Sequence, residues 1–114
     1  MKKDLNVIVT SSVNGISRIK MNESNTYNAL SSKTLQSLIS IFTKLNNDNT
    51  TKVIVIEGSG PGFSAGHNLK EIRFLNKKTK YKKLFNLCSK LMLTIIEGRK
   101  PVIAKVHGAA YAAG

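Results

Sequence analysis

The segment Val53–Ile56 has four consecutive apolar β-branched residues, and it constrains the fold more than any other part of the sequence. A strand that is apolar at every position has both faces covered, as in parallel sheets that lie between other layers. A second, mostly apolar run, Val102–Val106, follows Pro101 after a long helical pattern. Strands that are joined through a helix are typically parallel, with a right-handed crossover. The sequence therefore predicts an α/β layer architecture.

The remaining periodicities predict a hairpin and several helices around these strands. The predicted elements are strands at 5–10 and 16–21 joined by an Asn14-Gly15 turn, and helices from Ser31 or Ser32 to about Asn46, from Asn68 to Leu75 and from about Tyr81 to Glu97. Asn-Gly is a favoured hairpin turn because both residues tolerate positive φ. Apolar residues at steps of three and four predict a buried stripe on each long helix. The predicted order is β-β-α-β-α-α-β.

Chain length and cysteine content limit the classes of protein that remain. At 114 residues the chain is at most one domain, and its single cysteine, Cys88, excludes an internal disulfide and a cysteine-based zinc site. The N-terminus is too polar for a signal sequence, and no apolar run approaches the ~20 residues of a membrane span. We expect a buried Cys88 thiol, no metal site, no membrane span and a cytoplasmic protein, with the mitochondrial matrix as the alternative for a eukaryotic source.

The charge distribution has two explanations that the sequence leaves open. The formal net charge is +12, and one short stretch holds many of the basic residues: Lys70, Arg73, Lys77, Lys78, Lys80, Lys82 and Lys83. Such a patch favours a polyanionic partner, either nucleic acid or a phosphorylated small molecule. A solvated helix face explains it equally well. Because arginine and aromatic residues are few, we expect no specific nucleic-acid partner.

The loop GPGFSAGHNLK, residues 60–70, matches no phosphate-binding motif and makes a poor nucleophile site. A Walker loop needs Lys after its last glycine, where this chain has His67, and the dinucleotide fingerprint fails at Phe63. Gly62-Phe63-Ser64-Ala65-Gly66 spells G-x-S-x-G, but a nucleophile elbow follows its strand directly, and here the strand ends near Glu57.

Backbone chemistry suits the same loop better. Small residues before a helix start let a ligand oxygen approach N–H groups that are unpaired and carry partial positive charge. The loop GAAYAAG, residues 108–114, also follows a predicted parallel strand. Two such loops can direct two amides at one oxygen, which is an oxyanion hole.

Three motifs in order resemble the enoyl-CoA hydratase/isomerase (crotonase) superfamily: NTYNALS from Asn25, VIVIEGSGPGFSAGHNLKEI from Val53 and KPVIAKVHGAAYAAG from Lys100. The resemblance spans the chain from Leu5 onward. It implies a crotonase-like ββαβαβ spiral start, incomplete at the C-terminus, with residues 1–114 as the N-terminal part of a single domain. It also implies an acyl-CoA thioester substrate, a role in fatty-acid metabolism, and a homotrimer or hexamer only where the full domain is present.

The resemblance assigns roles to residues by motif position. The oxyanion amides are those of His67 and Ala113, with the His67 imidazole as a pocket wall and His107 as a structural residue. Coenzyme A, which is part of the substrate and the only cofactor implied, lies along Asn28, Ala29, Leu30, Ala65, Gly66, His67, Asn68, Leu69 and Lys70. Part of the basic patch attracts its phosphates.

This sequence departs from the family pattern at two places. Asn68 stands where the family usually has Asp, and the two catalytic glutamates of hydratases lie beyond the position of Gly114. None of the six acidic residues matches a catalytic position, and we expect Glu71 on a solvated helix face. Whether this chain is an enzyme is therefore left open. The alternatives are an inactive, degraded remnant and a basic, non-specific nucleic-acid binder.

Overall fold

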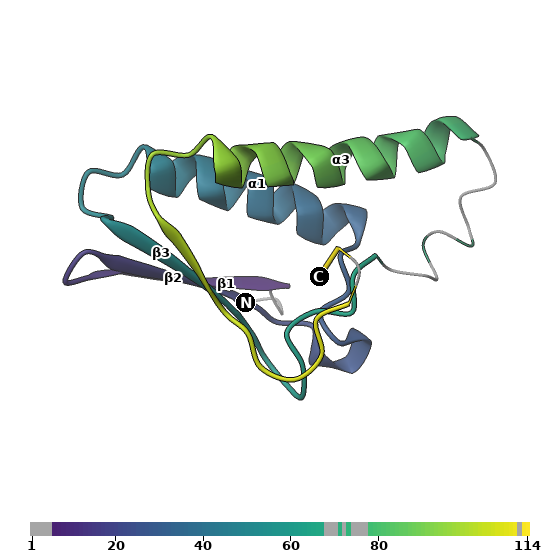
Figure 1. The fold of residues 1–114 in the computed structure, drawn as a ribbon, viewed down its shortest axis with the longest axis horizontal. Helices are drawn as coiled ribbons and strands as arrows, with labels where there is room; N and C mark the ends of the chain where they lie inside the picture. Colours follow the sequence, from purple (N-terminus) through teal and green to yellow (C-terminus); the bar gives the residue numbers. More distant parts are fainter. Residues whose placement is uncertain (1–5, 68–70, 72, 74–77, 112) are drawn as a thin grey trace, which may run out of the picture.

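The structure, a computed structural model, describes residues 6–67, 71, 73, 78–111, 113 and 114 (Figure 1). Its elements are β1 (Val7–Val13), β2 (Ile16–Met21), the short 3-10 helix η1 (Ser24–Thr26), α1 (Ser32–Asn46), β3 (Val53–Gly58), α3 (Lys78–Ile96) and β4 (Val102–Lys105). The predicted strands and long helices are confirmed in this order. The short helix predicted at 68–75 falls mostly outside the described residues, although Glu71 and Arg73 have helical backbone.

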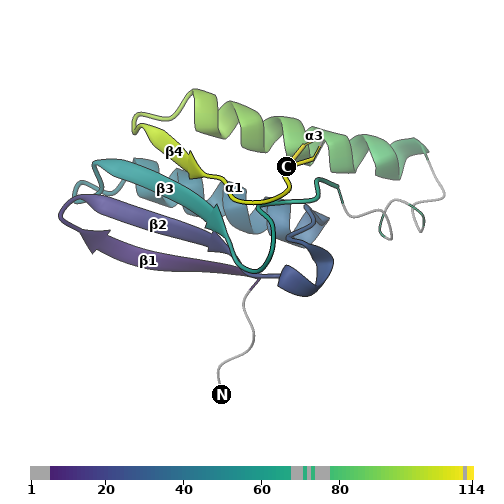
Figure 2. The ribbon, with the colours of Figure 1, turned by 60° about the horizontal axis from the view of Figure 1, so that its bottom comes forward.

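The strands form one sheet in the order β1-β2-β3-β4 (Figure 2). β1 and β2 are an antiparallel hairpin, whose turn has positive φ at Asn14 (53°) and Gly15 (84°). β2, β3 and β4 are parallel, as the all-apolar β3 predicted. β1 continues past the predicted end at Thr10, because the strand runs directly into this tight turn after a register shift between Thr10 and Val13.

Both long helices cover one face of the sheet and enclose the core (Figure 1). The stripe predicted on α1 is buried through Leu35, Leu38, Phe42 and Leu45, and it packs with sheet residues such as Ile19 and Ile54. Each fully buried side chain of this kind contributes roughly 1.5–3 kcal/mol relative to an exposed one. α3 starts earlier than predicted, at Lys78, and contributes Leu84 and Leu91 to the same core.

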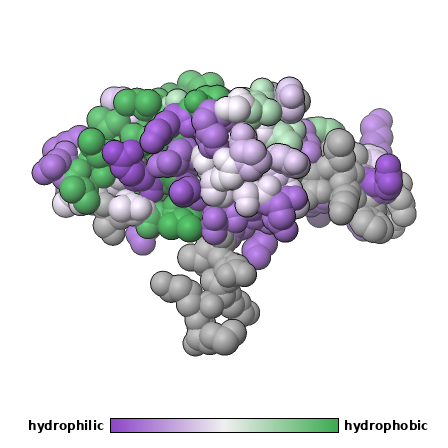
Figure 3. All heavy atoms as spheres, turned by 90° about the horizontal axis from the view of Figure 1, so that it is seen from below, coloured by the Kyte–Doolittle hydropathy of each residue, from purple (hydrophilic) through white to green (hydrophobic). Residues whose placement is uncertain are grey.

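The opposite face of the sheet carries a mixture of apolar and charged side chains (Figure 3). On β3, Ile54 on the helix side is fully buried and Val55 is only 9% exposed, so the strand is buried on both faces as predicted. Towards the sheet edges the cover is thinner, since Ile8 on β1 and Ile103 on β4 are exposed. Among the described residues, no helix is long and apolar enough to cross a membrane.

Candidate functional site

Three loops that carry the sequence motifs meet beyond the C-terminal ends of β2, β3 and β4 (Figure 1). Parallel strands end at the same edge of a sheet, and ligand sites of open α/β sheets form there. An isolated parallel bridge joins Leu30 to His67, and another joins Ser64 to Ala110. The middle segment, 63–67, therefore lies between segments 27–30 and 109–114.

Main-chain hydrogen bonds attach the middle segment to the loop after β4. The N–H groups of Phe63 and Ser64 donate to the Ala109 carbonyl at 2.9 and 3.2 Å, and Tyr111 N–H donates to the Ser64 carbonyl at 3.0 Å. The Gly114 N–H donates to the Tyr111 carbonyl at 2.7 Å, which closes a tight turn that includes Ala113. Sequence alone did not indicate that Ala109 would accept two bonds from the neighbouring loop.

Bonds on the other side orient the peptide unit between Gly66 and His67. Leu30 N–H donates to the Gly66 carbonyl at 2.6 Å. The described residues have no cis peptide bond, and in a planar trans peptide the N–H points opposite to the C=O. The N–H of His67 is therefore directed away from Leu30, towards the side on which segment 109–114 lies. Neither this N–H nor that of Ala113 donates to another described residue.

Asn28 links the loops from inside and is only 1% exposed. Its side-chain N–H₂ donates to the carbonyls of Ser59, Gly62 and Phe63 at 2.9, 3.2 and 3.1 Å, and its oxygen accepts from Glu23 N–H at 2.8 Å. Its neighbours Ala29 and Leu30 are also buried. The side chains of these three predicted coenzyme A contacts are buried, and that of Leu30 lines an apolar cavity that reaches the loops.

Ser64 is a buried polar residue and not an exposed nucleophile. Its hydroxyl donates to the Asn28 carbonyl at 2.9 Å and accepts from Gly66 N–H at 3.2 Å. An activated serine needs a general base, most often a histidine, within hydrogen-bond reach. His107, which the sequence offered for this role, instead forms a ring-nitrogen hydrogen bond of 2.7 Å with the Gly60 carbonyl.

The His67 side chain faces helix α3. Its ring meets Phe85 edge-on, with centroids 5.0 Å apart and planes at 87°, which is a favourable geometry for two aromatic rings. Its Nδ1 atom is buried without a hydrogen-bond partner among the described residues. The imidazole therefore packs against α3.

Glu71 corrects one sequence expectation. We expected this residue on a solvated helix face, but it is half-buried and its carboxylate accepts from Ser32 N–H at 2.9 Å and from the Ser32 hydroxyl. Helix starts have unpaired N–H groups and partial positive charge, which attract a carboxylate. Ser31, at the predicted N-cap, accepts from Thr34 N–H as expected. Three further predicted site residues, Asn68, Leu69 and Lys70, lie outside the described residues.

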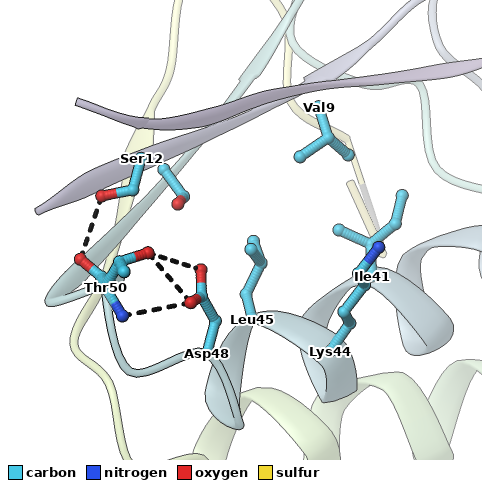
Figure 4. Close-up of a pocket in the computed structure, with 8 residues that line it drawn as sticks. Val9, Ser12, Ile41, Lys44, Leu45, Asp48 and Thr50 are labelled. Carbon is cyan, nitrogen blue, oxygen red and sulfur yellow. Dashed lines mark hydrogen bonds between the residues drawn. The ribbon is translucent and has the colours of Figure 1, made fainter.

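Two cavities lie between the helices and the sheet. One, of about 280 Å³, is mostly apolar and reaches the loops, with Leu30, Phe63 and Ala113 among its lining residues. The other, of about 450 Å³, lies at the far end of α1 beside β1 (Figure 4) and includes no predicted site residue. There the Thr51 hydroxyl, followed by Thr50, holds the pKa of Asp48 below its ordinary value of 3.8.

Two features predicted from the sequence, the buried Cys88 thiol and part of the basic patch, lie on α3. Cys88 packs partly buried against the core, and burial raises the pKa of its thiol. The lysines of the basic patch that are described, Lys78, Lys80, Lys82 and Lys83, are all exposed near the start of the helix. No acidic residue lies in that first turn, so the positive charge of the lysines adds to the partial positive charge at the N-terminal end of the helix.

Comparisons of the sequence and the structure with known proteins point to the same family. The model of the Enoyl-CoA hydratase/isomerase family matches residues 11–114. The enoyl-CoA hydratase domain-containing protein 3, mitochondrial, of Xenopus laevis is 42% identical over 100 residues, which are 88% of this chain and 34% of that protein. This chain thus spans about a third of the length of that relative.

Solved structures agree in fold. A crystal structure of enoyl-CoA hydratase from Mycobacterium smegmatis superposes with a TM-score of 0.94 and 37% identity, over 97% of this chain and 43% of that one. The human enoyl-Coenzyme A hydratase domain-containing protein 3 gives a TM-score of 0.89 and 36% identity, over 96% and 43% of the two chains. The spiral start implied by the sequence motifs is therefore the fold observed.

Proposed function

Since the chain belongs to the enoyl-CoA hydratase/isomerase family, we propose that residues 1–114 bind an acyl-CoA thioester and polarise its carbonyl through the N–H groups of His67 and Ala113. Such polarisation stabilises the enolate-like oxygen that develops next to a reacting thioester. The resemblance to the family implies that the glutamates that add water lie beyond the position of Gly114. The proposal for these residues is therefore limited to binding and polarisation, with hydratase or isomerase chemistry in fatty-acid metabolism as the wider role.

The observation that carries the proposal is the orientation of the Gly66–His67 peptide. Its carbonyl is held by Leu30, so its N–H points to the side occupied by segment 109–114, where the Ala113 N–H also has no acceptor among the described residues. Amides that are already oriented need no reorganisation when negative charge develops on the ligand oxygen. Small residues at 65, 66 and 113 leave room for that oxygen.

Two further features support binding of the coenzyme A part of the substrate. Segments 28–30 and 65–67 lie side by side through the Leu30–His67 bridge, so their backbone forms one continuous edge. The exposed lysines at the start of α3 follow this edge in the chain, and their charge attracts phosphates by a long-range field. A trimer or hexamer, and a cytoplasmic or mitochondrial location, belong to the proposal for the whole protein.

The experiment compares butyryl-CoA with free coenzyme A, using calorimetry for affinity and infrared spectroscopy of a ¹³C-labelled thioester carbonyl. The expected result is tighter binding of the thioester and a lowered carbonyl stretching frequency on binding. His67→Pro removes the N–H, because proline has none, whereas His67→Ala keeps it. One lost hydrogen bond is worth roughly tenfold in affinity, so only the proline variant should lose that factor and the carbonyl shift.

Two results would contradict the proposal. The first is equal affinity of the folded chain for butyryl-CoA and free coenzyme A with no carbonyl shift. The second is an equal loss in His67→Ala and His67→Pro, because the imidazole and not the amide would then be the contact. Circular dichroism of both variants establishes that each is folded before binding is measured.

A further inference from the structure

Ser64 carries a buried hydroxyl within the candidate site that the proposed chemistry does not use. It is 1% exposed, and both of its side-chain partners are main-chain groups, the Asn28 carbonyl and the Gly66 N–H. A serine hydroxyl offers one donor and two acceptor positions. Here the donor and one acceptor are engaged inside the site, between segments 27–30 and 63–67.

Gly66 is a flexible point immediately before the proposed oxyanion amide. Its φ of +84° lies in a region that glycine populates readily and other residues do not. Glycine has no side chain to restrict its rotation, so its own conformational preference holds the next peptide only weakly. Orientation of the Gly66–His67 peptide must come from hydrogen bonds to its neighbours.

Two such bonds are present, one on each side of the Gly66 α-carbon. The Ser64 hydroxyl holds the Gly66 N–H at 3.2 Å, and the Leu30 N–H holds the Gly66 carbonyl at 2.6 Å. The first restrains φ of Gly66 and the second restrains ψ. Together they fix the plane that carries the His67 N–H.

We infer that Ser64 is a positioning residue of the proposed thioester site, whose hydroxyl holds Gly66 so that the His67 N–H faces the ligand oxygen. This inference rests on the proposed function for its consequence in binding, but the restraint itself exists without a ligand. Without the hydroxyl, the Gly66 N–H and the Asn28 carbonyl lose a buried partner, and a rotated peptide relieves that loss. The main-chain bonds of Ser64 to Ala109 and Tyr111 do not depend on its side chain.

The test uses Ser64→Ala in the 114-residue chain, with Ser17→Ala as the matched control. Ser17 is 0% exposed and its hydroxyl is hydrogen-bonded at 2.7 Å to that of Thr51, so its loss also removes a buried hydroxyl contact. In ¹⁵N-labelled protein without ligand, Ser64→Ala should speed amide hydrogen exchange at Gly66 at least about tenfold, the factor for one lost hydrogen bond. It should also shift the His67 amide resonance. Ser17→Ala should leave both signals unchanged.

The second measurement is the ratio of the butyryl-CoA and free coenzyme A affinities. Ser64→Ala should reduce this ratio about tenfold, and Ser64→Cys, which keeps a weak donor and acceptor, should recover part of it. A purely structural role would lower both affinities equally or neither, which is the result expected for Ser17→Ala. Unchanged Gly66 exchange and His67 resonance in Ser64→Ala would overturn the inference whatever the ligand does.

The two proposals fail in distinguishable ways. If the unsubstituted chain binds butyryl-CoA and free coenzyme A equally while Gly66 exchange still responds to Ser64→Ala, the thioester function is wrong and the binding role of Ser64 is wrong with it. If the unsubstituted chain prefers the thioester but Ser64→Ala keeps the same preference, only the role of Ser64 is overturned.

Discussion

Replacement of Asn28 is the most informative single perturbation of this fold. The residue combines two demands in one position, since its side chain donates to three loop carbonyls and its backbone has a φ of +52°. Asparagine tolerates this left-handed conformation better than most residues. Asn28→Ala removes both adaptations, Asn28→Gly removes only the hydrogen bonds, and Asn28→Asp keeps the shape but removes the donors.

The expected loss of stability follows from the buried carbonyl groups that Asn28→Ala leaves without a hydrogen-bond donor. The bonds to the Gly62 and Phe63 carbonyls are buried, and each buried polar group without a partner costs about 1–3 kcal/mol. A left-handed backbone costs an alanine about 1–2 kcal/mol. Since the abandoned carbonyls relax partly, we expect Asn28→Ala to lower the free energy of unfolding by about 2–5 kcal/mol. Asn28→Gly should lose about 1 kcal/mol less, because it escapes the backbone strain.

Asn28→Asp separates hydrogen bonding from packing. It places a carboxylate oxygen against three carbonyl oxygens, so at neutral pH it should be less stable than Asn28→Ala despite its closer shape. Urea unfolding followed by helical circular dichroism measures all three variants. Asn47→Ala is the control, because Asn47 is exposed and its side chain makes a single bond to Thr43. A loss below about 1 kcal/mol in Asn28→Ala, or wild-type stability of Asn28→Asp, would refute this account of a buried polar clamp.

Two further predictions concern carboxylates. The pKa of Asp48 is lowered by Thr51 and Thr50. Its charged form therefore stabilises the fold above pH 3.8, and this contribution disappears as the pH falls below that value. In an acid titration, Asp48→Asn should lose stability less steeply than the unsubstituted chain below about pH 4, and identical curves for the two proteins would contradict this prediction. Glu71→Ala should cost about 0.5–2 kcal/mol, as for a lost helix cap. Unfolding of Glu71→Ala, Ser32→Ala and the double variant should show coupling, whereas additive losses would exclude the contact between the Glu71 carboxylate and the Ser32 hydroxyl.

The elements that sequence predicted well are those set by local pattern. The Asn14-Gly15 turn, the α1 stripe from Leu35 to Leu45 and the all-apolar β3 each follow from residues that are neighbours in the chain. Element ends were less accurate, as at the start of α3, which begins at Lys78 and not at about Tyr81. The motifs at 25–31, 53–72 and 100–114 also identified the family, which the matched relatives confirm.

The sequence did not predict the roles of two polar residues, Asn28 and Glu71. Asn28 has the family motif position of a coenzyme A contact, yet its side chain holds the loop after β3, more than thirty residues away in the chain. Glu71 looked like a surface residue but meets the start of α1. Asn28 bonds to backbone groups, and Glu71 bonds to both the N–H and the hydroxyl of Ser32. These partners are more than thirty residues away in the chain, and no local pattern in the sequence reveals them.

The sequence by itself determined the α/β class, the parallel strands and the small-residue loops, because periodicity and residue size act on adjacent positions. Only the tertiary structure decided which way the Gly66–His67 peptide faces. That direction depends on the Leu30 N–H, which the fold brings to the Gly66 carbonyl. It also depends on the Ser64 hydroxyl, which accepts from the Gly66 N–H and is held in place by the distant Asn28 carbonyl. A peptide next to glycine has no strong local preference, so its orientation is set by the neighbours that the fold brings to it.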